Sequence, residues 1–148
     1  ANQTGHEIGE VIDFHRLPQV LWPIHCVQDT MGAAFAQDLY MDRVARIFPK
    51  GTDSDIDSYS GFFDNGHRKA TGLGDYLKEK GVEAVGVLGL ATDYCVKFTA
   101  LDAVSLGFQT TLYKAASRGV NLQTGDVDRA IEDMRNNGVL IQEDVPSS

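Results

Sequence analysis

The chain has 148 residues, 43% of them hydrophobic and 23% charged, so it is long and apolar enough to bury the core of one globular domain. Its formal net charge of -8 argues against a nucleic acid or an anionic membrane as a partner. No apolar run is long enough to span a bilayer, no signal-peptide pattern is evident, and the two cysteines suggest no disulfide framework. We therefore expect a cytoplasmic protein.

The first third of the chain has weak structural signals. Residues 1–42 show little periodicity, so we expect a largely irregular region with short helical turns. Residues 43–48 alternate roughly between polar and apolar side chains, which predicts a strand. A break follows at Pro49, and residues 53–66 are polar with a short aromatic cluster, which predicts a loop.

The rest of the chain alternates between helical and strand patterns. Residues 71–80 have a helical apolar face and stop at Gly81. Residues 84–91 are small and apolar, which is typical of a parallel strand covered on both faces. We expect the remaining elements to be a helix over 93–106, a strand over 108–114, a helix over 126–137 and a strand over 138–141. This order predicts an α/β fold with a parallel sheet and right-handed crossovers.

Cys95 follows directly after the predicted strand, in the first turn of the next helix, where Thr92 and Asp93 are the expected N-cap residues. The positive end of a helix dipole favours a thiolate over a thiol. The same turn directs backbone N–H groups toward an anion, so Cys95 is a candidate nucleophile. The alternative is an inert buried cysteine, and position alone does not decide between the two.

Two other residues carry candidate chemistry. Lys50 follows a predicted strand and could stabilise a thiolate or an oxyanion, although a solvated turn lysine is the alternative. Because sites in parallel sheets lie at the carboxyl ends of the strands, we expect Lys50 and Cys95 to converge. His25 could be one metal ligand, but one ligand is not a site, and a core or surface histidine is the alternative.

Aromatic residues form two groups near these candidates. Trp22, the only tryptophan, could stack on a flat ring or belong to the core. Tyr59 and Phe62 lie close in sequence to Lys50 and could wall a pocket or anchor a loop.

The run Gly89–Val96 (GLATDYCV) resembles the nucleophile motif of the isochorismatase-like cysteine hydrolases. Three further runs, Trp22–Val27 (WPIHCV), Pro49–Asp53 (PKGTD) and Tyr59–Phe62 (YSGF), narrow the resemblance to members that hydrolyse nicotinamide to nicotinate and ammonia in NAD salvage. The resemblance covers nearly the whole chain. It implies one isochorismatase-like domain over residues 1–148, with a three-layer parallel-sheet α/β fold whose first strands are absent from this chain.

The resemblance also implies chemical roles. Cys95 would attack the amide carbonyl and form a thioester, assisted by Lys50. The backbone N–H groups of Ala91 and Cys95 would form the oxyanion hole, and the Leu90–Ala91 peptide would be cis.

For substrate and cofactor, the resemblance implies a nicotinamide pocket beside a metal ion. Trp22, Tyr59, Leu90 and Ala91 would line the pocket for the pyridine ring. His25 would be one ligand of a divalent ion, zinc, iron or manganese, that holds the pyridine nitrogen.

The sequence departs from the family pattern at its beginning. Family members carry a catalytic Asp after the first strand and an Asp-x-His pair after the second, and no position here matches either. We expect about 50 residues, two strands and a helix, to be missing before Ala1. The segment as written is then expected to be weakly active or inactive, and to form a homo-oligomer or associate with the missing N-terminal segment.

Two other functions stay open. One is hydrolysis of a different small carbonyl compound by the same superfamily chemistry. The other is a catalytically silent binding protein on the same fold, which the unmatched Asp keeps open.

Overall fold

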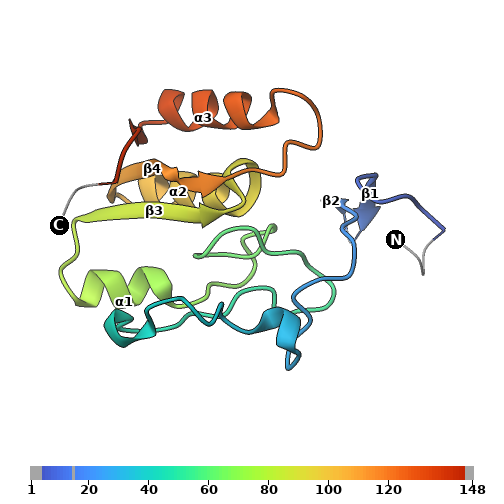
Figure 1. Ribbon diagram of the computed structural model, residues 1–148, viewed down its shortest axis with the longest axis horizontal. Coiled ribbons are helices and arrows are strands. Elements are labelled where there is room, and N and C mark those ends of the chain that lie inside the picture. Colours follow the sequence, from blue (N-terminus) through green and yellow to red (C-terminus); the bar gives the residue numbers. More distant parts are fainter. Residues whose placement is uncertain (1–4, 15, 146–148) are drawn as a thin grey trace. The chain divides into compact units, whose positions relative to one another are not determined.

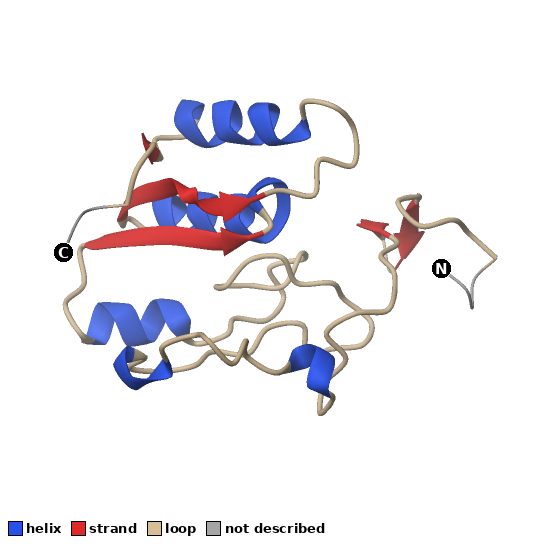
Figure 2. Cartoon of the chain, in the orientation of Figure 1, coloured by secondary structure: helices blue, strands red, loops and turns tan. Residues whose placement is uncertain are grey.

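The computed structural model describes residues 5–14 and 16–145, and the chain divides into two compact units, Ala1–Ile47 and Phe48–Ser148. Figure 1 traces the chain and Figure 2 separates its helices, strands and loops. None of the helices in the described part of the chain has the length and apolar content that a membrane crossing requires.

The first unit contains a hairpin that the sequence did not predict. Strands β1 (Val11–Phe14) and β2 (Leu17–Val20) pair antiparallel, and short 3-10 turns follow at Met31–Ala33 and Met41–Arg43. The expectation of irregular chain is therefore wrong for the hairpin and right for the short helical turns. A period-two signal arises where one strand face is buried, and this ribbon buries only Gln19 among its described residues.

The strand predicted over 43–48 is also wrong. Residues 44–50 belong to no strand, and their side chains are mostly exposed. Val44 has an extended backbone (φ -77°, ψ 112°). The alternation thus matches an extended segment, but no strand of the described chain pairs with it, and a strand exists only through such pairing.

The second unit confirms the predicted parallel α/β arrangement. Strands β3 (Ala84–Leu90), β4 (Gln109–Arg118) and β5 (Leu140–Gln142) form a sheet in that order, and both pairings are parallel. The helices are α1 (Leu73–Glu79), a π turn at Thr92–Val96 that leads into α2 (Lys97–Ser105), and α3 (Asp126–Asn136). Residues 53–66 form the predicted loop, with no helix or strand assigned before the isolated bridge at Phe63.

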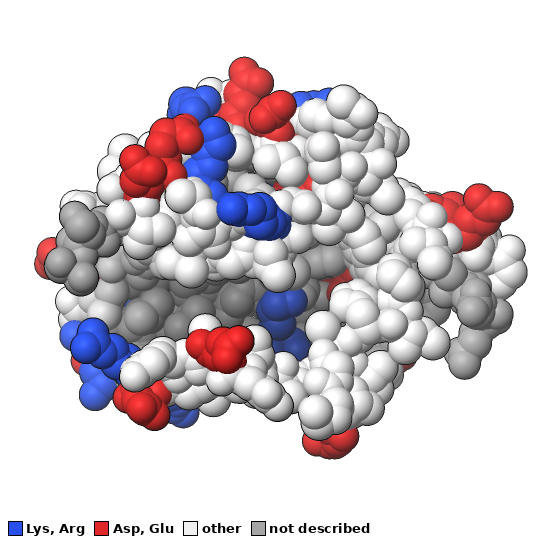
Figure 3. All heavy atoms as spheres, viewed as in Figure 1, with Lys and Arg blue, Asp and Glu red and all other residues white. Residues whose placement is uncertain are grey.

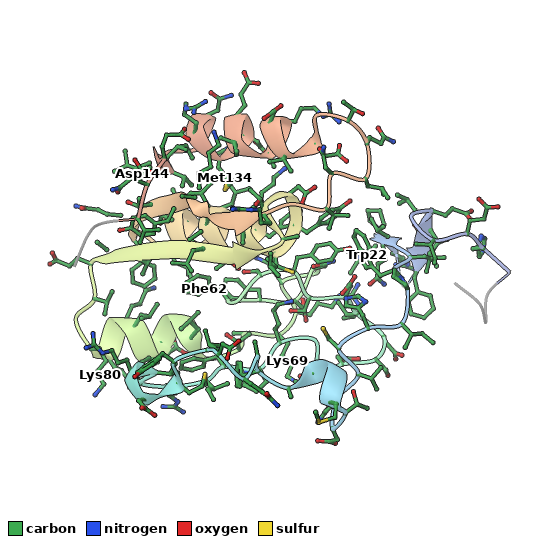
Figure 4. The ribbon with its side chains drawn as sticks, viewed as in Figure 1. Trp22, Phe62, Lys69, Lys80, Met134 and Asp144 are labelled. Atoms are coloured by element: carbon green, nitrogen blue, oxygen red, sulfur yellow. The ribbon has the colours of Figure 1, made fainter. Side chains whose placement is uncertain are left out.

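Two apolar clusters fix these elements. In the first, α2 and α3 pack side by side over β4, with Leu112 and Met134 fully buried. Met134 extends from α3 toward the sheet in Figure 4. The second cluster joins Phe62 to Phe108, and the predicted apolar face of α1 packs on it through Leu73 and Leu77. These contacts hold the junction between β3 and α2 from both sides.

β3 is less covered than predicted. Its residues alternate between half-buried and exposed, with Leu88 at 54% and Leu90 at 74% exposure. The exposed residues are every second one, so they share one face of β3, and that face is left exposed in the described part of the chain. β3 is also one of the two outer strands of the sheet. The expectation of cover on both faces is therefore wrong for the described residues.

Candidate active site

The π turn after β3 carries Cys95. The carbonyl of Ala91 accepts hydrogen bonds from the N–H groups of Tyr94 and Val96, both at 3.0 Å, which fixes the turn around the thiol. The peptide bond between Leu90 and Ala91 is cis, as expected from the resemblance. π turns interrupt helices rarely and are frequent at functional sites.

Lys50 reaches this thiol. Its Nζ lies 3.4 Å from Cys95 Sγ and donates a hydrogen bond of 2.7 Å to the carbonyl of Ser58. The predicted convergence of Lys50 and Cys95 is confirmed, but the reason given for it is wrong. Lys50 lies in an irregular segment rather than after a strand, and the loop around Ser58 holds its ammonium group in place.

The loop that receives Lys50 is itself tied to the helix that follows Cys95. The N–H of Gly61 donates to Thr99 Oγ1 at 2.9 Å, and the Thr99 hydroxyl donates to the carbonyl of Cys95 at 2.6 Å. At the other end of the loop, the N–H of Tyr59 donates to Asn65 Oδ1 at 2.9 Å. The loop is thus held by side chains rather than by regular secondary structure.

Asp93 does not cap its own helix. Its carboxylate is 8% exposed and accepts the N–H groups of Val120 at 2.9 Å and Asn121 at 2.7 Å, in the loop after β4. The N-cap position is Ala91, and no side chain of the described residues caps the turn. The N-cap prediction for Thr92 and Asp93 is therefore wrong, and Asp93 uses both oxygens to hold a neighbouring loop.

The aromatic residues near Lys50 are core residues. Tyr59 is 9% exposed and packs against Tyr94 and Phe98, with both ring centroids at 5.5 Å. Phe62 is buried and stacks on Phe108. Burial, followed by the negative charges of Asp93 and Asp126, raises the pKa of Tyr94 above the usual value for a phenol. Tyr59 and Phe62 therefore anchor the loop, as one of the two sequence interpretations has it.

A small cavity adjoins the other side of Lys50. It has a volume of about 200 Å³ and is lined by Thr52, Ser58 and Lys69 among others. Lys69 Nζ donates to Thr52 Oγ1 at 3.2 Å. Figure 4 labels Lys69 within the loop region of the second unit.

Trp22 and His25 lie in the first unit, just after β2, whereas the other candidate residues lie in the second. Trp22 is half-buried, and Figure 4 shows it beside the hairpin. His25 is exposed, and its Nδ1 lies 2.6 Å from the carbonyl oxygen of Pro23. This leaves Nε2 as the ring nitrogen that could bind a metal ion.

The residues present do not amount to a metal centre. Over residues 5–14 and 16–145, no group of three or more His, Cys, Asp or Glu side chains converges on one point. His25 supplies one imidazole nitrogen, whereas a protein zinc site takes three or four protein ligands. The donor set of the described chain therefore does not fit the divalent ion that the resemblance implies.

Comparison with known proteins gives the family. The model of the isochorismatase domain matches residues 11–144. The chain belongs to the isochorismatase family. The match includes the turn that carries Cys95 and the segments that carry Lys50 and His25.

Two curated relatives are nicotinamidases. The enzyme from Escherichia coli is 45% identical over 141 residues, or 95% of this chain, and the enzyme from Acinetobacter baylyi is 37% identical over 94% of this chain. The chain spans 66% and 64% of the length of these two relatives.

Two solved structures share the fold. The nicotinamidase and pyrazinamidase of Acinetobacter baumanii matches 95% of this chain with a TM-score of 0.90 and 43% identity, and the chain covers 67% of it. The pyrazinamidase of Pyrococcus horikoshii, in complex with zinc, matches 82% of this chain with a TM-score of 0.70 and 41% identity, and the chain covers 62% of it.

Sequence reasoning missed Thr99 and Ser58. Thr99 follows Cys95 by four residues, a spacing that places both on one face of a helix. Its bond to the Cys95 carbonyl could therefore have been predicted from the sequence. Ser58 acts through its backbone carbonyl, which any residue carries, and no sequence pattern marks it.

Proposed function

We propose that this protein hydrolyses nicotinamide to nicotinate and ammonia, with Cys95 as the nucleophile. The observation that carries the proposal is the 3.4 Å contact between Lys50 Nζ and Cys95 Sγ, in a chain 45% identical to a nicotinamidase. An ammonium group beside a sulfur atom at the start of a helix favours the thiolate form.

The proposed reaction has two stages. The thiolate adds to the amide carbonyl carbon, and the electron pair of the C=O bond moves to oxygen. When the C=O bond re-forms, the C–N bond breaks, and the nitrogen takes up a proton and leaves as ammonia. Water then adds to the thioester, and cleavage of the C–S bond releases nicotinate and returns the thiol.

The chain's own groups have distinct proposed roles. The N–H groups of Ala91 and Cys95 stabilise the oxyanion, and the Lys50 ammonium stabilises the thiolate and the negative charge that follows it. Leu90, Ala91, Tyr59 and Trp22 are proposed to contact the pyridine ring. Asp93 has no acid–base role in the proposal, because both its oxygens accept backbone hydrogen bonds.

A divalent ion, zinc, iron or manganese, is proposed as the cofactor, with His25 as the one ligand that the described residues offer. The pyrazinamidase of Pyrococcus horikoshii, which was solved in complex with zinc, supports this proposal.

The single domain and the cytoplasmic location also belong to the proposal. The match to one family model over residues 11–144 supports a single domain. Cys26 and Cys95 are both free thiols, which is usual in a reducing compartment and supports a cytoplasmic location.

The test is ammonia release from nicotinamide by the protein in its natural full length, with zinc, iron or manganese supplied. We expect Cys95→Ala to abolish release, and Lys50→Met to lower kcat/KM by about a hundredfold or more, since it removes a charge at the reacting atoms. Lys78→Met, which removes an exposed lysine of α1, is the matched control and should leave the rate unchanged.

Two outcomes would favour the alternatives. Release from other small amides but not from nicotinamide would point to a different hydrolase of the same family. Binding of nicotinamide without any ammonia release, unaffected by Cys95→Ala, would favour the silent binding protein.

A further inference from the structure

A closed ring of contacts links Lys50 and Cys95 through the loop 58–61. From Cys95 Sγ it passes to Lys50 Nζ at 3.4 Å and then to the Ser58 carbonyl at 2.7 Å. The backbone carries it to the Gly61 N–H, which donates to Thr99 Oγ1 at 2.9 Å. The Thr99 hydroxyl closes the ring by donating to the Cys95 carbonyl at 2.6 Å.

Thr99 is the one side chain in this ring that bonds both to the loop and to the nucleophile's backbone. Its oxygen accepts one hydrogen bond and donates another, which uses its single proton. The side chain is half-buried, and its two hydrogen bonds fix the position of its hydroxyl group.

We infer that Thr99 is a positioning residue for the Lys50–Cys95 pair. The Ser58 carbonyl anchors the Lys50 ammonium. The bond between Gly61 and Thr99 fixes the other end of the loop, beside the packing of Tyr59 on the same helix. Removing the Thr99 hydroxyl frees the Gly61 end of the loop, and the ammonium then shifts away from the sulfur. The inference rests on the proposed function only in taking Cys95 as the reactive thiol.

The test measures the thiol rather than turnover. In a Cys26→Ser background, which leaves Cys95 as the single cysteine, the rate of alkylation by iodoacetamide is followed by mass spectrometry as a function of pH. Thr99→Val keeps the shape and removes both hydrogen bonds. We expect it to lower the alkylation rate near neutral pH by about threefold to tenfold, because the displaced ammonium group no longer stabilises negative charge on the sulfur.

Three comparisons separate positioning from a general loss of structure. Thr99→Ser keeps the hydroxyl and should restore the parent profile. Ser105→Ala removes another hydroxyl-to-carbonyl bond on the same helix, to Asp102, and should have no effect. In a Lys50→Met background, Thr99→Val should change nothing further, since the ammonium that it positions is gone.

The inference is overturned if Thr99→Val alkylates like its parent at every pH, if Thr99→Ser is as slow as Thr99→Val, or if the effect persists without Lys50. Should Thr99→Val fail to fold by near-ultraviolet circular dichroism, Thr99→Ala removes the same two bonds from a smaller side chain, with the same expectations. Because alkylation needs no nicotinamide, a protein that shows this pattern without releasing ammonia would contradict the proposed function and leave the inference standing.

Discussion

Asp93 shows how one side chain holds the turn that carries Cys95 against the rest of the unit. Its two oxygens accept backbone N–H groups from residues 120 and 121, and it is buried while doing so. A buried carboxylate with two charge-assisted hydrogen bonds contributes more than a neutral side chain in the same place. Asp93, two residues before Cys95, therefore has a structural role.

We expect Asp93→Asn to lower the free energy of unfolding by about 2 kcal/mol, because an amide offers one oxygen and leaves one of the two N–H groups without its charged acceptor. Urea unfolding measures the change. Asp128→Asn removes the same charge from an exposed position and should cost a few tenths of a kcal/mol. Equal effects of the two variants would contradict the structural role of Asp93.

Tyr94 makes the stability of the fold depend on pH in the alkaline range. Burial first, and then the charges of Asp93 and Asp126, raise its pKa in the folded state. In the unfolded chain the phenol loses its proton near its ordinary value of about 10. Its contribution to stability is therefore complete below about pH 10 and is lost as the pH rises through the higher folded value.

We expect Tyr94→Phe to flatten the fall in stability above about pH 10, because it removes the group whose proton is held more tightly in the folded state. Urea unfolding in a series of alkaline buffers provides the measurement. Tyr40→Phe, at a tyrosine that is 80% exposed, should keep the pH dependence of the natural sequence. A Tyr94→Phe profile that parallels the natural one would rule out this role.

At the scale of elements, the sequence predicted the second unit well and the first unit poorly. The helices and strands from residue 71 onward were predicted because each buries one face, which leaves a period in the sequence. The hairpin of the first unit buries little of its surface, so its sequence shows no such period. The predicted end of the strand at residue 114 is early, because β4 continues through an irregularity to Arg118.

That irregularity lies opposite a short stretch of β3. Val87 pairs with Leu112, and Gly89 pairs with Ser117, so β4 holds extra residues between the two pairs. The Ser117 hydroxyl donates to the carbonyl of Tyr113 at 3.0 Å across the extra residues. Period-two alternation does not survive such an insertion, which explains the missed residues.

Some residues of the candidate site were predicted from the sequence and others were not. Cys95 was found because a buried strand followed by a helix start is visible in sequence. Lys50 was found for the wrong reason, since its segment is extended but unpaired. The loop bonds through Ser58 and Asn65 involve backbone groups and irregular chain, which carry no period.

Gly86 in β3 offers a test of packing at this scale. A Cβ added there would lie 2.5 Å from Cε2 of Tyr113, whose ring covers the glycine. We expect Gly86→Ala to cost about 1–3 kcal/mol, because the ring must move. Gly74→Ala in α1 is the matched control: its Cβ would lie 3.4 Å from Leu106 Cδ1, and helix propensity favours alanine by up to about 1 kcal/mol. Thermal unfolding of both variants gives the comparison. An unchanged melting temperature for Gly86→Ala would show that the Tyr113 ring moves aside without a cost in stability.

At the scale of the whole chain, burial is uneven. Among the described residues, every buried apolar side chain belongs to the second unit. Charges are mixed rather than gathered: Lys97 pairs with Asp133 at 2.6 Å, and Arg129 pairs with Asp126. Acidic and basic side chains alternate in the upper part of Figure 3, where α3 lies. Among the described residues on this face, no basic surface of the kind that binds nucleic acid is seen.

We expect amide hydrogen exchange to be slowest in β4 and α2 and fast in the β1–β2 hairpin, because local opening is cheapest where little apolar surface is buried. Exchange followed by mass spectrometry of peptic peptides resolves these segments. Peptides from residues 11–20 that exchange as slowly as those from 109–118 would contradict this expectation.

The bonds that Asp93 accepts come from main-chain nitrogens, so the identity of the side chain at position 120 is immaterial to them. A saturation library at Val120, whose side chain is 48% exposed, should therefore accept every residue type except proline, which has no amide hydrogen to offer. Position 120 is in this sense a place beside the Cys95 turn where the protein can be diversified without loss of the bonds to Asp93.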